Sequence, residues 1–304
     1  MSVIAGIDIG GTKTAVGLFD GQLNILKTAS FPTAGHTCQQ VANRCFEIVH
    51  SLCEELSTPY SKVSAVGVAS PGPLDLAGGR VVHIPTLGWK DEPVLEFFEK
   101  AFSRPAALQN DANAAALAEY RALSITHGTV VYITVSTGVG AGIVINGKIL
   151  DGCHSAAGEL GHIKVVPNGR PCGCGGQGCL EAYASGTAIA AIAGEHLGRP
   201  ISAREVFACA RSGDADMAGV VSAAADYLGL AISHIYQIID PKFIVLGGSV
   251  INDFDLLEDP IAEAVNRYTE PNSLRTVRIV KSRMDGMQGL IGAAYAAREA
   301  LKKA

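Results

Sequence analysis

The sequence predicts an α/β protein with two lobes, an internally duplicated core and a metal-binding loop. Two stretches share one pattern, in which a buried apolar strand, a glycine-rich turn with a threonine and a second strand follow one another. The first turn is Gly10-Gly11-Thr12-Lys13 and the second is Thr137–Gly142. This self-similarity indicates a duplication with one such turn in each half. A separate observation is the spacing H-x9-C-x-C-x4-C from His162 to Cys179, which is typical of a metal-binding loop.

The first half alternates short apolar runs with turn signals, which predicts a meander of strands followed by helices and further strands. The predicted strands are residues 3–9, 13–19, 24–31 and 63–69, and the segment 106–111 leads into a helix. Apolar spacing predicts one helix at 38–56. Alanines after Asn113 predict a second at 113–123, with Asn113 as its N-cap.

The second half is predicted to begin with strands and to continue mainly as helices. The strands are residues 129–136, 143–149, 243–247 and 276–281, and the helices are 187–197, 202–212, 215–238, 256–268 and 286–302. We expect a small N-terminal lobe of residues 1–110, on which the C-terminal helix 286–304 packs back, and a large lobe of residues 111–285. A nucleotide bound between the two lobes is the natural ligand, because interdomain clefts are common binding sites.

Composition excludes several other classes of protein. Of the 304 residues, 48% are hydrophobic and 17% charged, which is ample material for a core, and the net charge is −5 without a basic run. This argues against nucleic acid or an anionic membrane as partner. No apolar run approaches the roughly 20 residues of a membrane span, and the N-terminus lacks the basic region of a signal peptide. Five of the eight cysteines lie outside the metal motif without paired spacing, so we expect reduced thiols and a cytoplasmic protein.

The metal motif has four candidate ligands, His162, Cys172, Cys174 and Cys179. Three thiolates and one imidazole complete a tetrahedral zinc shell and leave no position for a water, so the predicted zinc is structural. The alternative is a glycine-rich surface loop with incidental cysteines. Glu159 and Glu181 flank the motif and could accept hydrogen bonds from the hydroxyls of a small polar ligand, although each could instead be a solvated surface residue.

The first glycine turn follows Asp8 and matches neither the P-loop nor the dinucleotide-binding spacing. Its exposed N–H groups could still hold phosphate oxygens, and Asp8 could hold Mg²⁺ directly or through water. The alternative is a hairpin with no ligand. Asp111 lies just before a predicted helix N-terminus, where the helix dipole should keep it ionised. The alternative is that Asp111 only caps this helix, as a second capping residue beside Asn113.

Taken together, these motifs resemble the ROK family of repressors, open reading frames and kinases over essentially the whole chain. The matching segments are Asp8–Lys13, Asn110–Asn113, Ser136–Gly142, Glu159–His162 and Cys172–Glu181. The resemblance implies the two-lobed actin-like (sugar kinase/RNase H-like) fold with a duplicated βββαβα core. It also implies transfer of the γ-phosphoryl group of ATP to a sugar hydroxyl, usually the 6-hydroxyl, with Mg²⁺ as cofactor.

The resemblance also implies roles for individual residues. Asp111 looks like the catalytic base, and His162 would give one ring nitrogen to zinc and the other to the sugar. The residues that look sugar-binding are Asn110, Glu159, His162, Glu181, Ser70 and Gly72, the last two in a loop that resembles the lining of the sugar pocket. The residues that look nucleotide-binding are Asp8, Gly10, Gly11, Thr12, Lys13, Thr137, Gly138, Val139, Gly140, Gly247 and Gly248.

Among family acceptors, the segment around Glu159 looks most like that of glucokinases, so we expect glucose, with N-acetylmannosamine or N-acetylglucosamine as the alternative. One departure is Thr86, where such glucokinases commonly have Asn. A sugar-responsive transcriptional regulator is the alternative of another class, but the first hairpin begins at residue 3 and leaves no room for a preceding DNA-binding module. The resemblance further implies a homodimer.

Overall fold

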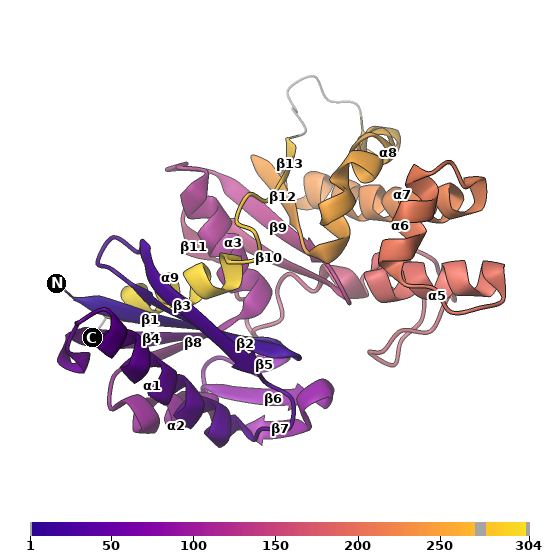
Figure 1. Cartoon of the computed structure of the whole chain (residues 1–304). Coiled ribbons are helices and arrows are strands. Elements are labelled where there is room, and N and C mark those ends of the chain that lie inside the picture. Colours follow the sequence, from indigo (N-terminus) through magenta and orange to yellow (C-terminus); the bar gives the residue numbers. More distant parts are fainter. Residues whose placement is uncertain (1, 271–277, 302–304) are drawn as a thin grey trace. The chain divides into compact units, whose positions relative to one another are not determined.

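The computed structural model describes residues 2–270 and 278–301. The chain divides into two compact units. Unit 1 consists of Met1–Ile125, Gly147–Ala157 and Met284–Ala304, and unit 2 of Thr126–Asn146 and Gly158–Arg283. The described residues form two five-stranded open sheets, each covered by helices (Figure 1). The chain therefore passes between the units at four points.

Unit 1 contains a sheet with the strand order β3-β2-β1-β4-β8. Its strands are β1 (Val3–Ile9), β2 (Lys13–Phe19), β3 (Ile25–Pro32), β4 (Val63–Ser70) and β8 (Ala106–Asn110). The first three form an antiparallel meander, whereas β4 is parallel to both β1 and β8. A second, three-stranded sheet consists of β5 (Leu74–Asp75), β6 (Arg80–Ile84) and β7 (Trp89–Glu92).

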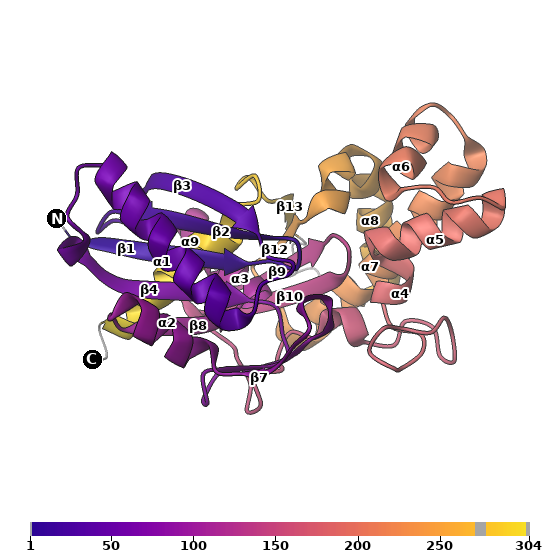
Figure 2. The ribbon, with the colours of Figure 1, turned by 60° about the horizontal axis from the view of Figure 1, so that its bottom comes forward.

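Alternation along β1 decides which helices cover which face of this sheet. Val3, Ala5, Ile7 and Ile9 point into one core with α1 (Cys38–Glu55) and α2 (Val94–Phe102). Ile4 lies in the opposite core with α9 (Gln288–Leu301), and Figures 1 and 2 show α9 on that other face. Helix α3 (Asp111–Ala122) follows β8 and packs against α9.

Glycine is required where α9 crosses the sheet. A Cβ on Gly67 would lie 1.8 Å from the Ala293 carbonyl oxygen, and one on Gly6 would lie 2.6 Å from the Leu290 oxygen. Both contacts are with backbone, which cannot swing away. The C-terminal helix therefore sits directly on β1 and β4 because these strands carry no side chain at the crossing points.

Unit 2 repeats the same plan. The second five-stranded sheet has the strand order β11-β10-β9-β12-β13. Its strands are β9 (Thr129–Val135), β10 (Val139–Ile145), β11 (Lys148–Ile149), β12 (Phe243–Gly247) and β13 (Ile279–Lys281). As in unit 1, an antiparallel hairpin is extended by two parallel strands. The helices are α4 (Glu181–Ala184), α5 (Gly186–Leu197), α6 (Ala203–Arg211), α7 (Ala215–Ile239) and α8 (Phe254–Tyr268).

The order β10-β9-β12-β13 reproduces β2-β1-β4-β8 strand for strand, so the predicted duplicated α/β core is confirmed. Within the described residues, α7 is the one helix that could cross a membrane by length and composition, which the sequence analysis did not anticipate. However, 56% of its apolar window is buried inside the protein, as in a core helix. The stripe through Val220, Ala224, Leu228 and Ile232 lies in the core of unit 2.

Three predicted boundaries differ from the structure. Helix α3 begins at Asp111 with Asn110 as its N-cap, so the prediction of Asn113 as N-cap was wrong. Strand β10 begins at Val139, which shortens the predicted turn 137–142. The division into units places α3 in unit 1, together with α9, whereas the predicted lobe boundary was at residue 110. Residues 276–277 of the last predicted strand lie outside the described residues.

Candidate active site

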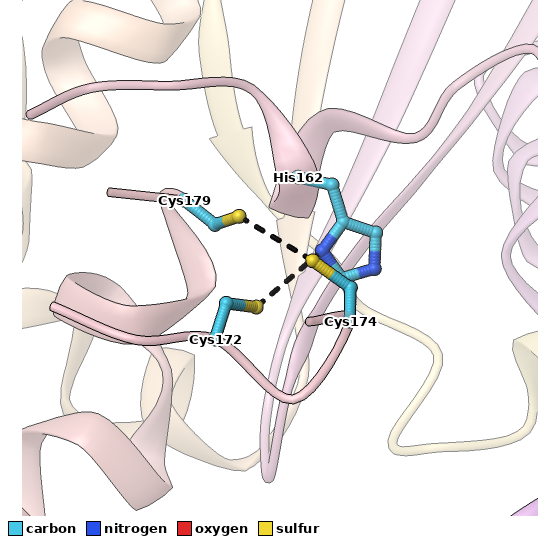
Figure 3. Close-up of side chains that lie close together, drawn as sticks. All are labelled: His162, Cys172, Cys174 and Cys179. Atoms are coloured by element: carbon cyan, nitrogen blue, oxygen red, sulfur yellow. Dashed lines mark hydrogen bonds between the residues drawn. The ribbon is translucent and has the colours of Figure 1, made fainter. Parts of the chain in front are cut away.

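The four predicted metal ligands converge in unit 2. One ligand atom from each of His162, Cys172, Cys174 and Cys179 lies within 4.8 Å of all the others (Figure 3). The Cys172 Sγ is 3.7 Å from His162 Nδ1, and the Cys174 and Cys179 Sγ atoms are 3.6 Å apart. Tetrahedral bonds of about 2.3 Å to sulfur and 2.0 Å to nitrogen imply ligand separations of about 3.5–3.8 Å. The donor set and its spacing therefore fit zinc.

Glycines let the metal-binding loop fold back on itself. Gly178 has φ +73°, and a Cβ there would lie 1.8 Å from the Val166 carbonyl oxygen. A Cβ on Gly169 would lie 2.0 Å from the Tyr183 hydroxyl oxygen, the atom that accepts a hydrogen bond from the Arg170 N–H. Side chains at either position would open the loop and separate its ligands.

Two charged side chains contact this cluster from outside. His162 turns Nδ1 toward the thiols and Nε2 toward Glu159, whose Oε2 is 3.9 Å away. Lys164 donates from Nζ to the Cys179 Sγ at 2.8 Å. The sequence analysis missed Lys164, although its place two residues after His162 was a usable signal. Its ammonium group offsets part of the negative charge that three thiolates would bring.

Glu181 links the metal-binding loop to the second glycine turn. Its Oε2 accepts a hydrogen bond from the Val139 N–H at 3.0 Å, and its Oε1 is 3.8 Å from the Cys172 Sγ. A Cβ on Gly138 would lie 2.4 Å from the same Oε2. The carboxylate thus stabilises the conformation of this turn, a contact that the sequence did not reveal.

The second glycine turn follows β9, and Gly247-Gly248 lies at the end of β12, so both turns lie at the carboxyl ends of neighbouring parallel strands. The Ser136 and Ser249 hydroxyl oxygens are 3.0 Å apart across these two strand ends. Gly248 has φ +93°, and a Cβ there would lie 2.3 Å from the Val135 carbonyl oxygen. The first residues of α5 also reach this turn, because the Gly186 N–H donates to the Ser136 carbonyl at 2.7 Å. Backbone N–H groups at a helix start and a tight turn suit an anionic ligand.

In unit 1 the predicted residues also gather at the carboxyl ends of parallel strands. Asp8 on β1 pairs in register with Ala69 on β4, and Ser70 on β4 pairs with Asn110 on β8. A Cβ on Gly72 would lie 3.5 Å from the Asn110 Nδ2, so this loop closes over the same edge. The carboxyl edge of a parallel sheet is where open α/β proteins bind their ligands.

Asp8 and Asp111 are electrostatically coupled at this edge. Burial, and then the negative charge of Asp111, raise the pKa of Asp8 from 3.8 to about 7, while Lys13 lowers it. A Cβ on Gly289, in the first turn of α9, would lie 2.5 Å from the Asp8 Oδ2, so the helix closes one side of the carboxyl group. The raised pKa of Asp8 therefore reflects its burial first and the negative charge of Asp111 second, and a bound cation would relieve both effects.

The start of α3 holds Asn110 and Asp111 in defined orientations. The Asn110 Oδ1 accepts from the N–H groups of Ala112 and Asn113 at 3.0 and 3.1 Å. The Asp111 Oδ1 accepts from the Ala112 N–H at 2.8 Å. The backbone of the first helical turn therefore orients both side chains.

The first glycine turn is closed by a hydrogen bond from the Gly10 N–H to the Lys13 carbonyl at 3.0 Å. Thr86, the residue that departs from the glucokinase-like pattern, lies beside this turn, because a Cβ on Gly11 would be 3.3 Å from its Oγ1. Unit 1 therefore places Thr86 next to the first turn.

The predicted site residues divide between the two units. Unit 1 holds the first turn, Asp8, Ser70, Gly72, Asn110 and Asp111. Unit 2 holds the candidate metal ligands, Glu159, Glu181, the second turn and Gly247-Gly248.

A family model described as ROK family matches residues 4–300. The chain belongs to the ROK family. It is 32% identical to a glucokinase of Streptomyces coelicolor over 98% of each chain. It is 36% identical to an N-acetylmannosamine kinase of Yersinia pestis over 97% of this chain and 98% of that one.

Solved structures of ROK proteins have the same fold. A ROK hexokinase from Thermus thermophilus is 34% identical with a TM-score of 0.85, covering 99% of this chain and all of that one. A ROK family glucokinase from Streptomyces griseus, solved in complex with glucose and AMPPNP, is 31% identical with a TM-score of 0.81, covering 98% of this chain and 100% of that one. The predicted family and fold class are confirmed.

Proposed function

We propose that this protein is an ATP-dependent hexose kinase that transfers the γ-phosphoryl group of ATP to the 6-hydroxyl of glucose. The observation that carries the proposal is the carboxylate pair Asp8 and Asp111 at the carboxyl edge of the unit 1 sheet, beside a glycine turn suited to phosphate. The glucokinase relatives and the glucokinase complex with glucose and AMPPNP support the choice of acceptor and donor.

In this reaction Asp111 acts as the general base. The sugar O6 attacks the γ-phosphorus, the bond from that phosphorus to the β–γ bridging oxygen breaks, ADP leaves, and the hydroxyl proton passes to the Asp111 carboxylate. An ordinary aspartate is a weak base toward an alcohol. In a loose transition state the proton leaves late, so orientation of the carboxylate matters more than its basicity. The hydrogen bond from the Ala112 N–H supports that orientation.

The residues proposed to bind the nucleotide lie on the glycine turns. Backbone N–H groups of Gly10–Lys13 and Thr137–Gly140 bind phosphate oxygens, and Gly247-Gly248 contact the adenosine. Mg²⁺, when bound, neutralises phosphate charge and would be held by Asp8 directly or through water. The coupled carboxyl groups of Asp8 and Asp111 fit this role, because a divalent cation removes their repulsion.

The residues proposed to bind the sugar are Asn110, Ser70, Gly72, Glu159, His162 and Glu181. A zinc ion bound by the four candidate ligands would be structural. It would orient His162 so that Nε2, the nitrogen turned toward Glu159, could donate to a sugar hydroxyl. Glu181 contacts both the metal-binding loop and the second turn, so it would couple sugar binding to the phosphate site.

An ADP-release assay with Mg·ATP over a panel of hexoses and N-acetylhexosamines tests this proposal. We expect kcat/KM for glucose to exceed that for every other sugar by at least about tenfold, a discrimination of about 1.4 kcal/mol. An N-acetyl sugar in first place would favour the second candidate, an N-acetylmannosamine or N-acetylglucosamine kinase. That candidate is supported by the 36% identity to the Yersinia pestis enzyme and by Thr86 in place of Asn.

No turnover with any sugar, together with intact sugar binding, would instead indicate a sugar sensor or regulator. The predictions of a homodimer and a cytoplasmic location remain open to direct test. Light scattering after size exclusion gives the first, and fractionation of the source cell gives the second.

A further inference from the structure

The segment Gly147–Ala157 belongs to unit 1, although it interrupts the chain of unit 2. It contains a loop that is closed by a hydrogen bond from the Ala157 N–H to the Asp151 carbonyl at 3.1 Å. Gly152 has φ +78°, and a Cβ there would lie 3.2 Å from the Ala157 nitrogen. The loop is therefore a compact element that presents the Asp151 side chain.

The Asp151 side chain accepts hydrogen bonds from two buried amides. Its Oδ1 is 3.0 Å from the Gln109 Nε2 and 3.4 Å from the Asn113 Nδ2. Gln109 is 7% exposed and Asn113 is 4% exposed. These two residues flank Asn110 and Asp111 in the sequence. Buried amide groups without partners are costly, so this carboxylate decides how both amides are oriented.

A continuous chain of hydrogen bonds runs from Asp151 to the start of α3. Gln109 donates to Asp151, and its Oε1 accepts from the Asn110 N–H at 2.7 Å. The Asn110 Oδ1 in turn accepts from the Ala112 and Asn113 N–H groups. With Asp151 present, the Gln109 amide has one orientation that satisfies both of its ends. Without it, the Gln109 NH2 group is buried without this acceptor, and the amide can turn away from Asn110.

We propose that Asp151 is a positioning residue, which acts through Gln109 and Asn113 to hold the Asn110–Asp111 pair in its reactive orientation. The inference rests on the proposed role of Asp111 as general base. Asp151 is not among the residues proposed to bind the sugar or the nucleotide. Its contribution is therefore to kcat, because a misplaced base is bound in the complex but reacts slowly.

The test compares Asp151→Ala with Asp151→Asn and with His154→Ala, an exposed residue of the same loop. Asp151→Ala is expected to lower kcat by about tenfold to a hundredfold, with KM for ATP within about twofold of wild type. Asp151→Asn keeps an oxygen at the Oδ1 position, so kcat returns to within about threefold of wild type. His154→Ala behaves as wild type. A variant that merely contains less folded protein would lose apparent kcat and zinc content in the same proportion. The zinc content of each sample is therefore measured together with kcat.

Two further readouts separate positioning from general destabilisation. Gln109→Leu removes the group that donates to Asp151. Adding Asp151→Ala to this variant is therefore expected to lower kcat by no more than about a further twofold, whereas independent roles would make the two decreases in kcat multiply. Hydrogen exchange at the Ala112 and Asn113 amides is expected to accelerate about tenfold in Asp151→Ala and to recover in Asp151→Asn.

The exchange measurement does not depend on turnover. If wild type phosphorylates no sugar, the proposed function fails, and the exchange at Ala112 and Asn113 still decides whether Asp151 orients this turn. Unchanged kcat and exchange in Asp151→Ala would overturn the inference. So would a loss of kcat that Asp151→Asn does not restore, or losses that multiply in the double variant.

Discussion

The two sheets share a strand order but carry different chemistry at their carboxyl edges. Asp8 is the next-to-last residue of β1, and Thr134 is the next-to-last residue of β9. Unit 1 ends β8 with Asn110 and follows it with Asp111, whereas unit 2 ends β13 with Lys281 and follows it with Ser282. The edge of unit 1 is therefore anionic, and the edge of unit 2 carries glycines and hydroxyls.

This difference shows how a duplicated scaffold comes to serve two purposes. The strand order depends on apolar alternation, which both halves retain, whereas the ligand chemistry depends on a few residues at the strand ends. In the proposed kinase, unit 1 carries the base, the cation site and one phosphate-binding turn. Unit 2 carries the other turns for the nucleotide and a metal-binding loop that would orient sugar-binding groups. The following predictions, from the largest expected effect to the smallest, test this division.

Asp111→Asn is expected to abolish turnover, with a fall in kcat of at least about a thousandfold, because the base is lost while the oxygen that accepts from the Ala112 N–H is kept. Isothermal titration should find sugar and ATP affinities close to wild type. The matched control is Asp214→Asn at the start of α7 in unit 2, where Asp214 caps the helix and Asn caps equally well. Turnover of Asp111→Asn within tenfold of wild type would remove Asp111 from the proposed role.

Removal of zinc, or Cys174→Ser, is expected to weaken sugar binding by at least about tenfold, because the loop that carries Glu159 and Glu181 loses its constraint. Limited proteolysis should then cut between residues 159 and 181. Cys153→Ser, an exposed cysteine outside the metal cluster, is the control and should change neither zinc content nor affinity. A zinc-free protein that binds sugar normally would show that unit 2 does not depend on its metal.

The raised pKa of Asp8 predicts a pH-dependent stability. The unfolded chain releases this proton near the ordinary value of 3.8, whereas the folded protein retains it up to about pH 7. Stability is therefore lost as the pH rises through this window and stays low above it. Asp8→Asn should raise Tm by several degrees more at pH 8 than at pH 5, because most of the window lies above pH 5.

The measurement is the difference in Tm between variant and wild type from pH 5 to pH 8.5 without added Mg²⁺, with the exposed Glu99→Gln as control. Added Mg·ATP should lessen the difference at pH 8, because a bound cation favours the ionised carboxylate. An Asp8→Asn difference that does not vary with pH would mean that the Asp8 carboxyl group has an ordinary pKa in the folded protein.

The smallest expected effect compares one glycine from each unit. Gly248→Ala should lower the free energy of unfolding by about 1–3 kcal/mol, since its φ of +93° strains an alanine and the new Cβ meets the Val135 backbone. Gly11→Ala should cost less than about 1 kcal/mol, because its neighbour is the Thr86 side chain, which can move. Denaturant unfolding gives both values. Equal costs would mean that the two turns are equally constrained.

Several elements were accessible from sequence because their signals are local. Apolar runs bounded by Gly10-Gly11 marked the first hairpin, and the spacing of three cysteines after His162 marked the metal-binding loop. Helix boundaries were less accurate where two candidates competed. Asn110 and Asn113 are both good N-caps, and only the path of β8 decided that Asn110 has the extended backbone that a cap requires.

By itself, the sequence determined the α/β class, the duplication and the candidate metal ligands, since each rests on periodicity or spacing within a few residues of chain, and it indicated the family through its resemblance to ROK motifs. Only the tertiary structure showed that Lys164 bonds Cys179, that Glu181 holds the second turn, and that Gln109 meets Asp151 across 42 residues of chain. The physical reason is that buried amides and carboxylates choose partners by geometry after the strands and helices have packed. No pattern in the chain records those choices in advance.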